Sequence, residues 1–376
     1  MAQAAIALLG TRLAGGIISG PAGAGSLPRE VEWTEGGHPL PDWKSVHAAR
    51  RALDRAGEAS RNGELLLVLL SGGGSAMLAL PAAGLTLEDK RATIDVLSRG
   101  GVNITDLNTV RKHLSAIKGG RLSATHATRC LTLAISDVHI PEDDPATIAS
   151  GPTVPDPTTF ADGLRTVERS RISVPARVRL HLERGAAGDW EETPKAGDAR
   201  LSRSVYEVIA NRRTAMGGAM REAARRGYAV SCIDEPVHGE AADAGRAFAE
   251  CGLAEGIETR PACVIASGET TVTVKGTGRG GRNQEFTLGA AQQLARSRPG
   301  VVASLGTDGV DGPTDAAGAI VTSETVSRAL ACGADLHDYL ARNDAYTVLD
   351  KLDALIKWGP TFTNVGDVHV LLSVPE

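Results

Sequence analysis

Glycine-rich stretches in this chain follow apolar runs and carry hydroxyl or basic side chains. One follows the apolar run of residues 65–70, and another leads into Arg282. Backbone N–H groups at strand ends and helix starts bind phosphate groups, and glycine leaves them uncovered. We therefore predict that a phosphate-bearing cofactor contacts Gly72, Gly73, Gly74, Ser75, Gly278, Gly280 and Gly281. The alternative, which the first loop fits equally well, is that the glycines only permit tight turns.

Acidic residues follow two of the predicted strands. Asp308 and Asp311 come after residues 301–305, and Asp137 comes after residues 130–135. Carboxylates are preferred ligands of Mg²⁺, so Asp308 and Asp311 are candidate metal ligands, although Asp-Gly pairs also form plain turns. Asp137 lies close in sequence to a second acidic cluster and is the candidate general base. A single acid at a strand end is otherwise an ordinary cap.

Basic residues are concentrated between positions 108 and 121, beside two consecutive glycines. The stretch contains Asn108, Arg111 and Lys118. Guanidinium and ammonium groups next to an amide would suit a carboxylate or a phosphate ligand. A solvated helix face is the alternative explanation, because it accounts for most runs of charge.

The glycine loops lack the sharper nucleotide-binding and hydrolase motifs. The loop after residue 70 does not end in the Gly-Lys-Ser/Thr of a Walker motif, and Met77 replaces the second glycine of a nucleophile elbow. Gly276, Gly278 and Gly281 have the spacing of a dinucleotide fingerprint. However, the preceding residues 270–274 alternate like a half-exposed strand, and the next strand-end acid lies too far along the chain. We favour a phosphate loop.

Short apolar runs alternate with amphipathic segments along the chain, which is typical of α/β proteins. Strands are predicted at residues 65–70, 130–135, 206–210, 228–233, 263–266, 301–305 and 368–374, and helices at 45–60, 87–99 and 214–226. The run 65–70 is continuous and bounded by polar turns, so we expect a strand that is buried on both faces of a parallel sheet. The segment 206–233 is expected to open a second domain as a βαβ unit.

The length of 376 residues exceeds the size at which a single core usually stops growing. Residues 186–200 contain glycine and proline without apolar periodicity, and we predict that they link two domains. The expected fold is therefore α/β with domains at 1–190 and 201–376. Each domain is expected to hold a mostly parallel sheet flanked by helices.

The net charge of -5 gives no basic surface for nucleic acid, and no apolar run is long enough to span a membrane. The five cysteines are odd in number and widely spaced, which predicts reduced thiols, most of them in the core. We expect a cytoplasmic protein, a monomer or a homodimer, whose partner is a small molecule.

Six motifs taken in order closely resemble the class II glycerate kinases. They are residues 108–115, 117–120, 150–153, 280–285, 306–309 and 363–365, and the resemblance covers nearly the whole chain. It implies transfer of a phosphoryl group from ATP to the 2-hydroxyl of D-glycerate with Mg²⁺. It also implies two α/β domains with the active site in the cleft between them, and a C-terminal half that contains the MOFRL module.

The resemblance also suggests roles for individual residues. Arg282 would offset charge on the transferred phosphoryl group, with Asp137 and Lys118 as further catalytic groups. Asn108, Arg111 and Lys118 would bind glycerate, and Asp308 and Asp311 would hold Mg²⁺. Relatives are often labelled hydroxypyruvate reductases, so an NAD(P)H-dependent reductase is the runner-up, and a non-catalytic metabolite-binding relative is the third hypothesis.

The chain departs from the family pattern in three places. Residues 139–142 stand where the family usually has a shorter glycine-containing turn, and Ala266-Ser267-Gly268 replaces Ser-Gly-Gly. In addition, the family carries a strand and a Gly-Lys-Ala turn before the helix that residues 1–10 resemble. A phosphoryl-transfer site without that lysine loses a charge directed at the transition state, so we expect weak activity or none from the chain as given.

Overall fold

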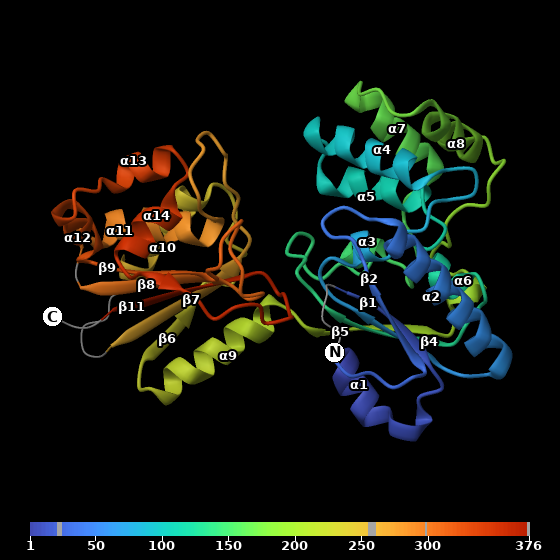
Figure 1. Cartoon of the computed structure of the whole chain (residues 1–376), viewed down its shortest axis with the longest axis horizontal. Helices are drawn as coiled ribbons and strands as arrows, with labels where there is room; N and C mark the ends of the chain where they lie inside the picture. The colour runs from blue at the N-terminus through green and yellow to red at the C-terminus, as the bar shows by residue number, and fades with distance from the viewer. Residues whose placement is uncertain (21–24, 255–260, 298, 374–376) are drawn as a thin grey trace. The chain divides into compact units, whose positions relative to one another are not determined.

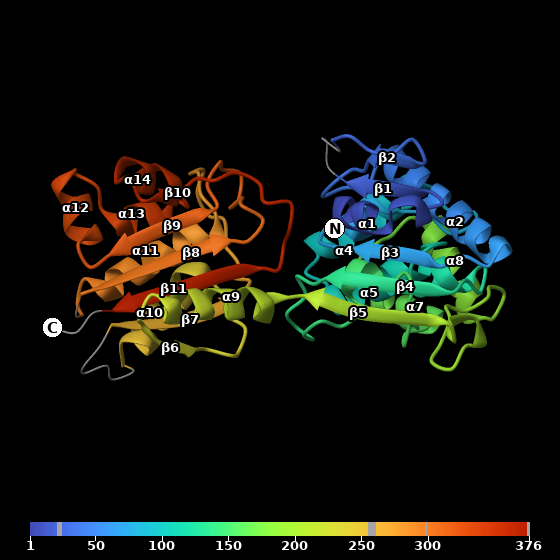
Figure 2. The same cartoon turned by 90° about the horizontal axis from the view of Figure 1, so that it is seen from below.

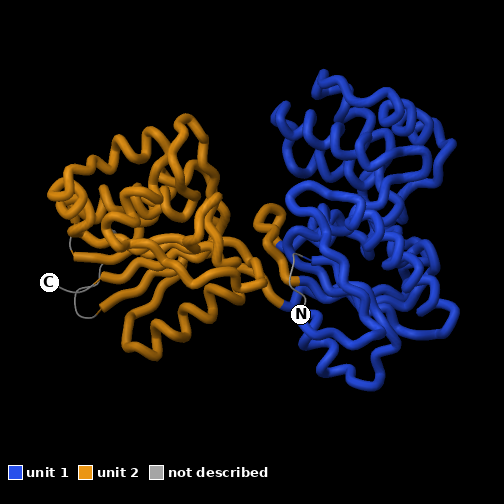
Figure 3. Tube along the Cα trace, viewed as in Figure 1, with its two compact units in different colours: residues 1–134, 143–209 blue, residues 135–142, 210–376 orange. Residues whose placement is uncertain are grey.

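The computed structural model describes residues 1–20, 25–254, 261–297 and 299–373. The chain forms two compact units, which Figure 3 shows in different colours. Unit 1 is Met1–Ala134 with Asp143–Ile209, and unit 2 is Ile135–Glu142 with Ala210–Glu376. The limits predicted for the domains, 1–190 and 201–376, are not the limits of these units. Residues 186–200, the predicted linker, lie inside unit 1, where the Glu192 carboxylate accepts a hydrogen bond from the backbone N–H of Phe160.

Unit 1 contains two small sheets and several helices (Figure 1). Its strands are β1 (Gly16–Gly20), β2 (Val31–Glu35), β3 (Leu66–Leu70), β4 (Cys130–Ile135) and β5 (Ser204–Ala210). Its helices are α1 (Ala2–Leu9), α2 (Trp43–Asn62), α3 (Gly74–Met77), α4 (Leu87–Arg99), α5 (Ile104–His113), α6 (Arg121–Ala124), α7 (Phe160–Ser170) and α8 (Ala176–Ala186). Short 3₁₀ turns lie at η1 (Gly10–Arg12), η2 (Ile148–Ser150) and η3 (Ala199–Leu201).

The three-stranded sheet of unit 1 has the order β3-β4-β5, and β1 pairs with β2 separately. β3 and β4 are parallel, as predicted. β5 pairs with β4, and backbone hydrogen bonds from Cys130 to Arg203 and from Ser136 to Ala210 flank this pairing. The prediction that residues 206–233 open a second domain as a βαβ unit is therefore wrong. β3 lies at the edge of the sheet, and four of its five residues are only half-buried. The expectation that both faces of this strand are buried is therefore wrong.

A separate apolar core joins α4, α5, α7 and α8. Leu97, Val110, Val167 and Leu182 are among its fully or almost fully buried members. Capping boxes fix the starts of α4 and α7, where Thr86 and Thr159 accept hydrogen bonds from the backbone at the third helical position. This helical cluster positions the basic end of α5.

Unit 2 is built on a six-stranded sheet of order β10-β9-β8-β11-β7-β6, which Figure 2 shows. Its strands are β6 (Ala229–Cys232), β7 (Ala262–Gly268), β8 (Gly300–Gly306), β9 (Gly318–Thr322), β10 (Leu355–Ile356) and β11 (Asp367–Ser373). Its helices are α9 (Arg212–Arg225), α10 (Ala241–Ala254), α11 (Arg282–Leu294), α12 (Thr325–Ala331), α13 (Leu336–Ala341) and α14 (Ala345–Lys351).

β7 is the strand buried on both faces. Its Cys263 and Ile265 pack with α9, whereas Val264 and Ala266 join the core formed with α10 and α11. Figure 1 shows these helices on opposite faces of the sheet. Continuous burial explains the uniformly apolar sequence of this strand.

The α/β class with two compact units and helix-covered sheets is confirmed. The expectation of a mostly parallel sheet is wrong for unit 2, where β6 and β7 are the only parallel pair among the strands of the described residues. The pairs β7-β11, β11-β8, β8-β9 and β9-β10 are antiparallel. The loop between β8 and β9 holds no helix, so the chain returns beside β8 without the crossover that parallel pairing requires. The segment 270–274 forms one isolated bridge instead of the predicted strand.

None of the helices in the described residues is long and apolar enough to cross a membrane. All five cysteines are free thiols, as predicted. Only Cys130 and Cys263 are buried, so the expectation that most cysteines are core residues is wrong.

Candidate functional site

Helix α5 carries Asn108 and Arg111, two of the three predicted substrate-binding residues of unit 1. Asn103 caps the start of this helix by accepting a hydrogen bond from the backbone N–H of Asp106 at 2.9 Å. Asn108 and Arg111 lie three residues apart and therefore share a helix face. Arg111 Nη1 donates to Asn108 Oδ1 at 3.1 Å, which fixes the guanidinium beside the amide.

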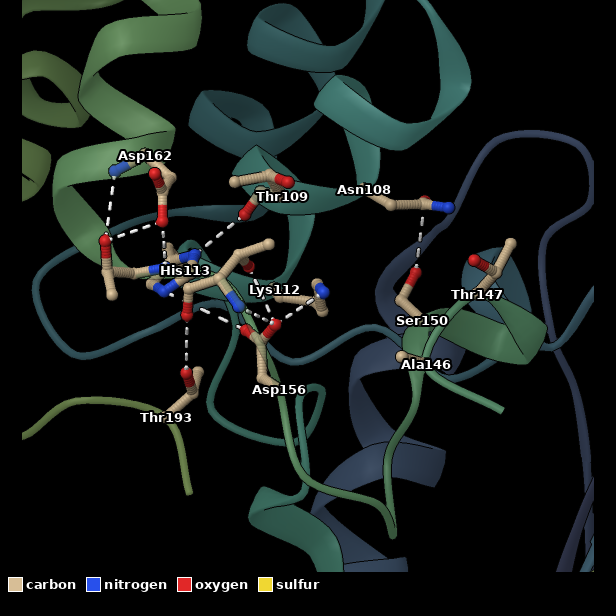
Figure 4. Close-up of polar contacts among 12 residues, drawn as sticks. Asn108, Thr109, Lys112, His113, Ala146, Thr147, Ser150, Asp156, Asp162 and Thr193 are labelled. Carbon is tan, nitrogen blue, oxygen red and sulfur yellow. Dashed lines mark hydrogen bonds and ion pairs between the residues drawn. The ribbon is translucent and has the colours of Figure 1, made fainter. Parts of the chain in front are cut away.

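A strained turn at residues 149–150 connects these groups to the rest of the predicted site. Ala149 and Ser150 both adopt positive φ angles, 52° and 60°, which side chains other than glycine rarely do and which are concentrated at functional sites. Ser150 Oγ donates to Asn108 Oδ1 at 3.4 Å (Figure 4). It also lies 2.7 Å from Ser75 Oγ. Lys118 Nζ donates to the backbone oxygen of Ala149 at 3.2 Å. The turn thus gathers Ser75, Asn108 and Lys118, which are far apart in sequence.

Basic side chains are buried together in this corner of unit 1, and burial disfavours their charged forms. Lys118 is 3% exposed; burial lowers its pKa well below the usual range, and the charges of Lys90 and Arg111 lower it further. Burial also lowers the pKa of Arg111. Our sequence reasoning missed Lys90, which belongs to α4. Lys90, Thr93 and Leu97 are the buried residues of that helix and lie at helical spacing, so the periodicity of α4 could have placed Lys90 inside.

The neighbouring Lys112 and His113 hold α5 in place. Lys112 Nζ donates to Asp156 Oδ1 at 2.5 Å, and both side chains are buried. The ring of His113 contacts the Thr109 backbone oxygen through Nδ1 at 2.8 Å and Glu192 through Nε2 at 3.0 Å. Figure 4 shows His113, Lys112 and Asp156 gathered on one side of the helix, with Asn108 turned toward Ser150. In this charged motif, Lys112 and His113 therefore support the fold, whereas Asn108 and Arg111 are the residues proposed to bind a ligand.

The first glycine loop has packing reasons for its composition. Gly73 has a φ of +81°, and a Cβ there would lie 2.4 Å from Met77 Cε. A Cβ on Gly74 would lie 3.0 Å from the Cβ of Ala149, so this loop approaches the strained turn closely. Tight turns and close packing are therefore sufficient to explain the glycines of this loop. Phosphate binding by Gly72, Gly73, Gly74 and Ser75 stays a prediction.

In unit 2, Arg282 starts α11 and is held by two carboxylates. Its Nε and Nη2 donate to Asp367 Oδ2 and Oδ1 at 2.7 and 3.0 Å, and its Nη1 donates to Glu269 at 2.9 Å. Burial disfavours the guanidinium charge, but the bonds to Asp367 outweigh it and raise the pKa of Arg282. The arginine is therefore a fixed cation, one-third exposed, at the start of a helix.

Asp311 caps the same helix from a distant loop. Gly281 offers no capping side chain, and Asp311 instead accepts hydrogen bonds from the backbone N–H groups of Asn283 and Gln284 at 3.1 and 3.0 Å. A Cβ on Gly281 would lie 2.3 Å from Asp311 Cγ, so this approach requires glycine. Burial raises the pKa of Asp311 to about 6, although the two backbone donors oppose the shift.

The second glycine loop packs on protein backbone. The N–H of Gly278 donates to the Arg342 oxygen at 3.0 Å, so it is already used. A Cβ on Gly280 would lie 3.3 Å from Ala345. Because Asp311 also occupies N–H groups of α11, the phosphate roles of Gly278, Gly280 and Gly281 stay predictions without geometric support.

Asp308 and Asp311 do not form a closed metal cluster. Asp308 Oδ1 accepts a hydrogen bond from the backbone N–H of Val310 at 3.1 Å, as in an Asx turn. Across residues 1–20, 25–254, 261–297 and 299–373, no group of three or more His, Cys, Asp or Glu side chains is placed to hold a metal ion. The metal roles therefore stay predictions.

Asp137 lies in the segment of unit 2 that precedes the 143–209 part of unit 1. Asn364 Nδ2 donates to Asp137 Oδ2 at 3.1 Å. The charges of Arg282, Asp367 and Asp137 all act on Glu269, whose pKa partial burial raises. The structure thus gathers Asp137 and Arg282 with Glu269 and Asp367, two residues that our sequence reasoning missed. Glu269 directly follows β7 and Asp367 begins β11, and these positions at strand ends could have identified both residues from the sequence.

A buried polar chain supports this cluster from inside the sheet. Ser304 Oγ donates to Asn283 Oδ1 at 2.6 Å, and Asn283 Nδ2 donates to Asp367 Oδ1 at 3.0 Å. His369 Nδ1 lies 2.8 Å from Ser304 Oγ, and its ring stacks on Phe286 with centroids 4.1 Å apart. Since the Ser304 hydrogen is directed at Asn283, the His369 Nδ1 must donate to Ser304. Burial agrees with a neutral ring, because it lowers the pKa of His369 to about 4.

Two family models match the chain. The model described as "Domain of unknown function (DUF4147)" matches residues 1–183, and the MOFRL family model matches residues 262–367. These two matches lie mainly in unit 1 and unit 2, respectively.

Comparison with known proteins gives relatives that align over most of this chain and most of their own length. The chain is 39% identical to the glycerate 2-kinase of Pyrococcus horikoshii, over 93% of this chain and 80% of that protein. It is 38% identical to the D-glycerate 2-kinase of Thermotoga maritima, over 100% of this chain and 88% of that protein. An Agrobacterium vitis protein named putative hydroxypyruvate reductase is 39% identical over 91% of this chain and 77% of its own length.

The fold comparison agrees with the sequence comparison. The crystal structure of the glycerate kinase of Thermotoga maritima matches with a TM-score of 0.88 at 38% identity, covering 100% of this chain and 88% of that chain. Identity at this level over most of both chains establishes descent as well as fold. This chain therefore belongs to the glycerate 2-kinase family of enzymes.

Proposed function

We propose that this chain transfers the γ-phosphoryl group of ATP to the 2-hydroxyl of D-glycerate, with Mg²⁺, to give 2-phosphoglycerate. The observation that carries the proposal is a pair of clusters with basic side chains: a corner of buried basic residues in unit 1, and an arginine fixed by two carboxylates in unit 2. Phosphoryl transfer requires mainly positioning and charge stabilisation, which these two clusters can supply. The names of the Pyrococcus and Thermotoga relatives support the choice of glycerate.

In unit 1, Arg111 and Lys118 would bind the glycerate carboxylate, and Asn108 would bind a hydroxyl group. The arginine presents a planar fork that matches a carboxylate. Because Arg111 is already bonded to Asn108, its orientation is set before the ligand arrives. Such preorganisation lowers the entropy lost on binding.

In unit 2, Arg282 would contact the transferred phosphoryl group. Arginine has five N–H donors, and three of them are directed at Asp367 and Glu269. The remaining donors can bind phosphoryl oxygens while the carboxylates hold the guanidinium plane. Asp137 is the proposed general base for the 2-hydroxyl proton.

The donor set fits Mg²⁺ in part. Asp308 has a carboxylate oxygen to offer, and Mg²⁺ commonly binds one or two carboxylates together with substrate phosphates and water. Asp311 fits poorly, because both of its oxygens accept hydrogen bonds from α11. We therefore assign Asp308 as the protein ligand and Asp311 as the helix cap. When bound, the ion would neutralise charge on the phosphates of ATP.

The runner-up is an NAD(P)H-dependent hydroxypyruvate reductase, which the name of the Agrobacterium relative suggests. A dinucleotide fingerprint must follow directly on a strand and open a helix. In this chain β7 ends at Gly268, and residues 270–274 form one isolated bridge before Gly276. The geometry therefore favours the kinase.

A single experiment separates the hypotheses. Purified protein is given ATP, Mg²⁺ and D-glycerate while ADP is measured, and in parallel NADH and hydroxypyruvate while NADH is measured. ADP formation that requires glycerate, without NADH oxidation, supports the kinase. NADH oxidation alone supports the reductase, and ligand binding without either reaction supports a non-catalytic relative.

A further inference from the structure

Lys90 is a buried lysine to which the proposed function gives no role. It sits in the first turn of α4, its residue is 5% exposed, and its ammonium group finds no hydrogen-bond partner among the described residues. A buried charge without a partner is strongly unfavourable, so such a group is expected either to lose its proton or to meet an anion. Neighbouring Arg91 is exposed, so the burial is specific to position 90.

The charges that face Lys90 have the same sign as its own. Burial, together with the charges of the nearby guanidinium groups of Arg111 and Arg121, lowers the pKa of Lys90 to about 7. Lys90 in turn acts on Lys118. Arg121 starts α6 and has acidic neighbours of its own, Glu192 and Asp156. Basic groups on α4, on α5 and in the loop that holds Lys118 therefore lie close enough to lower the pKa of one another.

A bound anion would balance the charge of such a cluster. Two oxygen atoms are already bonded to members of the cluster, the Ala149 carbonyl, which Lys118 contacts, and the Asn108 amide, which Arg111 contacts. Both are neutral acceptors, so neither offsets the charge of the lysines and the arginine. A small carboxylate would supply two charged acceptor oxygens, and it would raise the affinity of nearby amines for protons.

We propose that Lys90 is an additional ligand of the substrate carboxylate, beside Arg111 and Lys118, and that the amine cluster takes up a proton when this anion binds. The inference rests on the proposed function for the identity of the anion, but the anion site itself rests only on the unpartnered buried lysine and its cationic neighbours. In the empty site, repulsion and burial keep the cluster partly deprotonated. The bound anion restores the charge.

The test is calorimetric titration of the whole chain with D-glycerate, without nucleotide, at pH 7.5 in buffers that differ in ionisation enthalpy. The observed heat should depend on the buffer in the sense of net proton uptake. In Lys90→Met, which keeps an unbranched side chain one atom shorter and without charge, D-glycerate should bind about 10- to 100-fold more weakly and with less proton uptake. Arg91→Met is the matched control and should behave like the wild type.

Folding of the variant is checked by its thermal transition. Lys90→Met removes a buried amine, so its midpoint without anion should equal or exceed that of the wild type, and D-glycerate should raise it less. Wild-type affinity and wild-type proton uptake in Lys90→Met would overturn the inference. The inference would also be overturned if the wild-type protein bound neither D-glycerate nor inorganic phosphate.

A further outcome separates this inference from the proposed function. If the wild type binds inorganic phosphate with proton uptake, does not bind D-glycerate, and loses phosphate binding in Lys90→Met, the anion site at Lys90 is supported. In that case the glycerate assignment of Arg111 and Lys118 fails instead.

Discussion

Asp367→Asn tests whether a buried carboxylate sets the working position of Arg282. Asp367 is fully buried at the start of β11 and accepts two hydrogen bonds from the guanidinium and one from Asn283. An asparagine presents one acceptor oxygen, and its amide N–H groups would face the N–H groups of Arg282. At least one of the two guanidinium bonds is therefore lost.

The expected magnitude follows from the geometry. A hydrogen bond to a charged group contributes about 1.5–3 kcal/mol. Arg282 is one-third exposed, so solvent screening favours the lower half of that range. At 1.36 kcal/mol per tenfold change in rate, loss of one such bond in the transition state lowers kcat by about 10- to 50-fold.

The assay is glycerate-dependent ADP release at saturating substrates, with KM measured for both substrates. Glu269→Gln is the matched control, because Glu269 contacts the same guanidinium once and its side chain is 50% exposed. Its effect on kcat should stay below about fivefold. A turnover of Asp367→Asn within about twofold of the wild type, in a variant that melts normally, would refute the positioning argument. Equal losses in both variants would refute the role of burial.

Three further predictions concern unit 2. Arg282→Lys should lower turnover strongly, since an ammonium cannot reproduce the planar fork; an unchanged kcat would remove Arg282 from the site. Asp308→Asn should raise the Mg²⁺ concentration for half-maximal activity more than the KM for glycerate, and an identical Mg²⁺ titration would leave Asp308 as a turn residue. The pKa of His369 is lowered from 6.5 to about 4 in the folded state, so its contribution to stability is fully present above about pH 6.5 and is lost as the pH falls toward 4. His369→Phe, measured by thermal midpoints from pH 4.5 to 7, should flatten this dependence, and a slope equal to that of the wild type would contradict the buried neutral ring.

The sequence alone was sufficient for most local structure. The apolar run before the first glycine loop predicted β3, and the pattern of residues 87–99 predicted α4 with its glycine at the end. These elements depend on contacts between near neighbours in the chain, which periodicity records. The order of motifs also predicted the family, because several short matches in sequence are specific together.

Tertiary structure decided which strands pair and which are buried. The apolar composition of β3 and β7 is similar, yet β3 is an edge strand and β7 has a helix layer on each face. β11, the last strand in the chain, lies between β7 and β8 and makes most pairs of that sheet antiparallel. Pairing between distant segments depends on packing of the whole unit, which local sequence does not encode.

The candidate site shows the same division. Sequence patterns found Arg282, Asp311, Arg111 and Lys118, since their residue types and neighbouring glycines suggest ligands. Only the fold showed that Asp311 caps α11, and that Glu269 and Asp367 hold Arg282. It also buried Lys90 close enough to Arg111 and Lys118 for the charges of these residues to act on one another. The charge of a residue can be read from the sequence, but its partners and burial are set by segments far away in the chain, and these determine whether it binds a ligand or supports the fold.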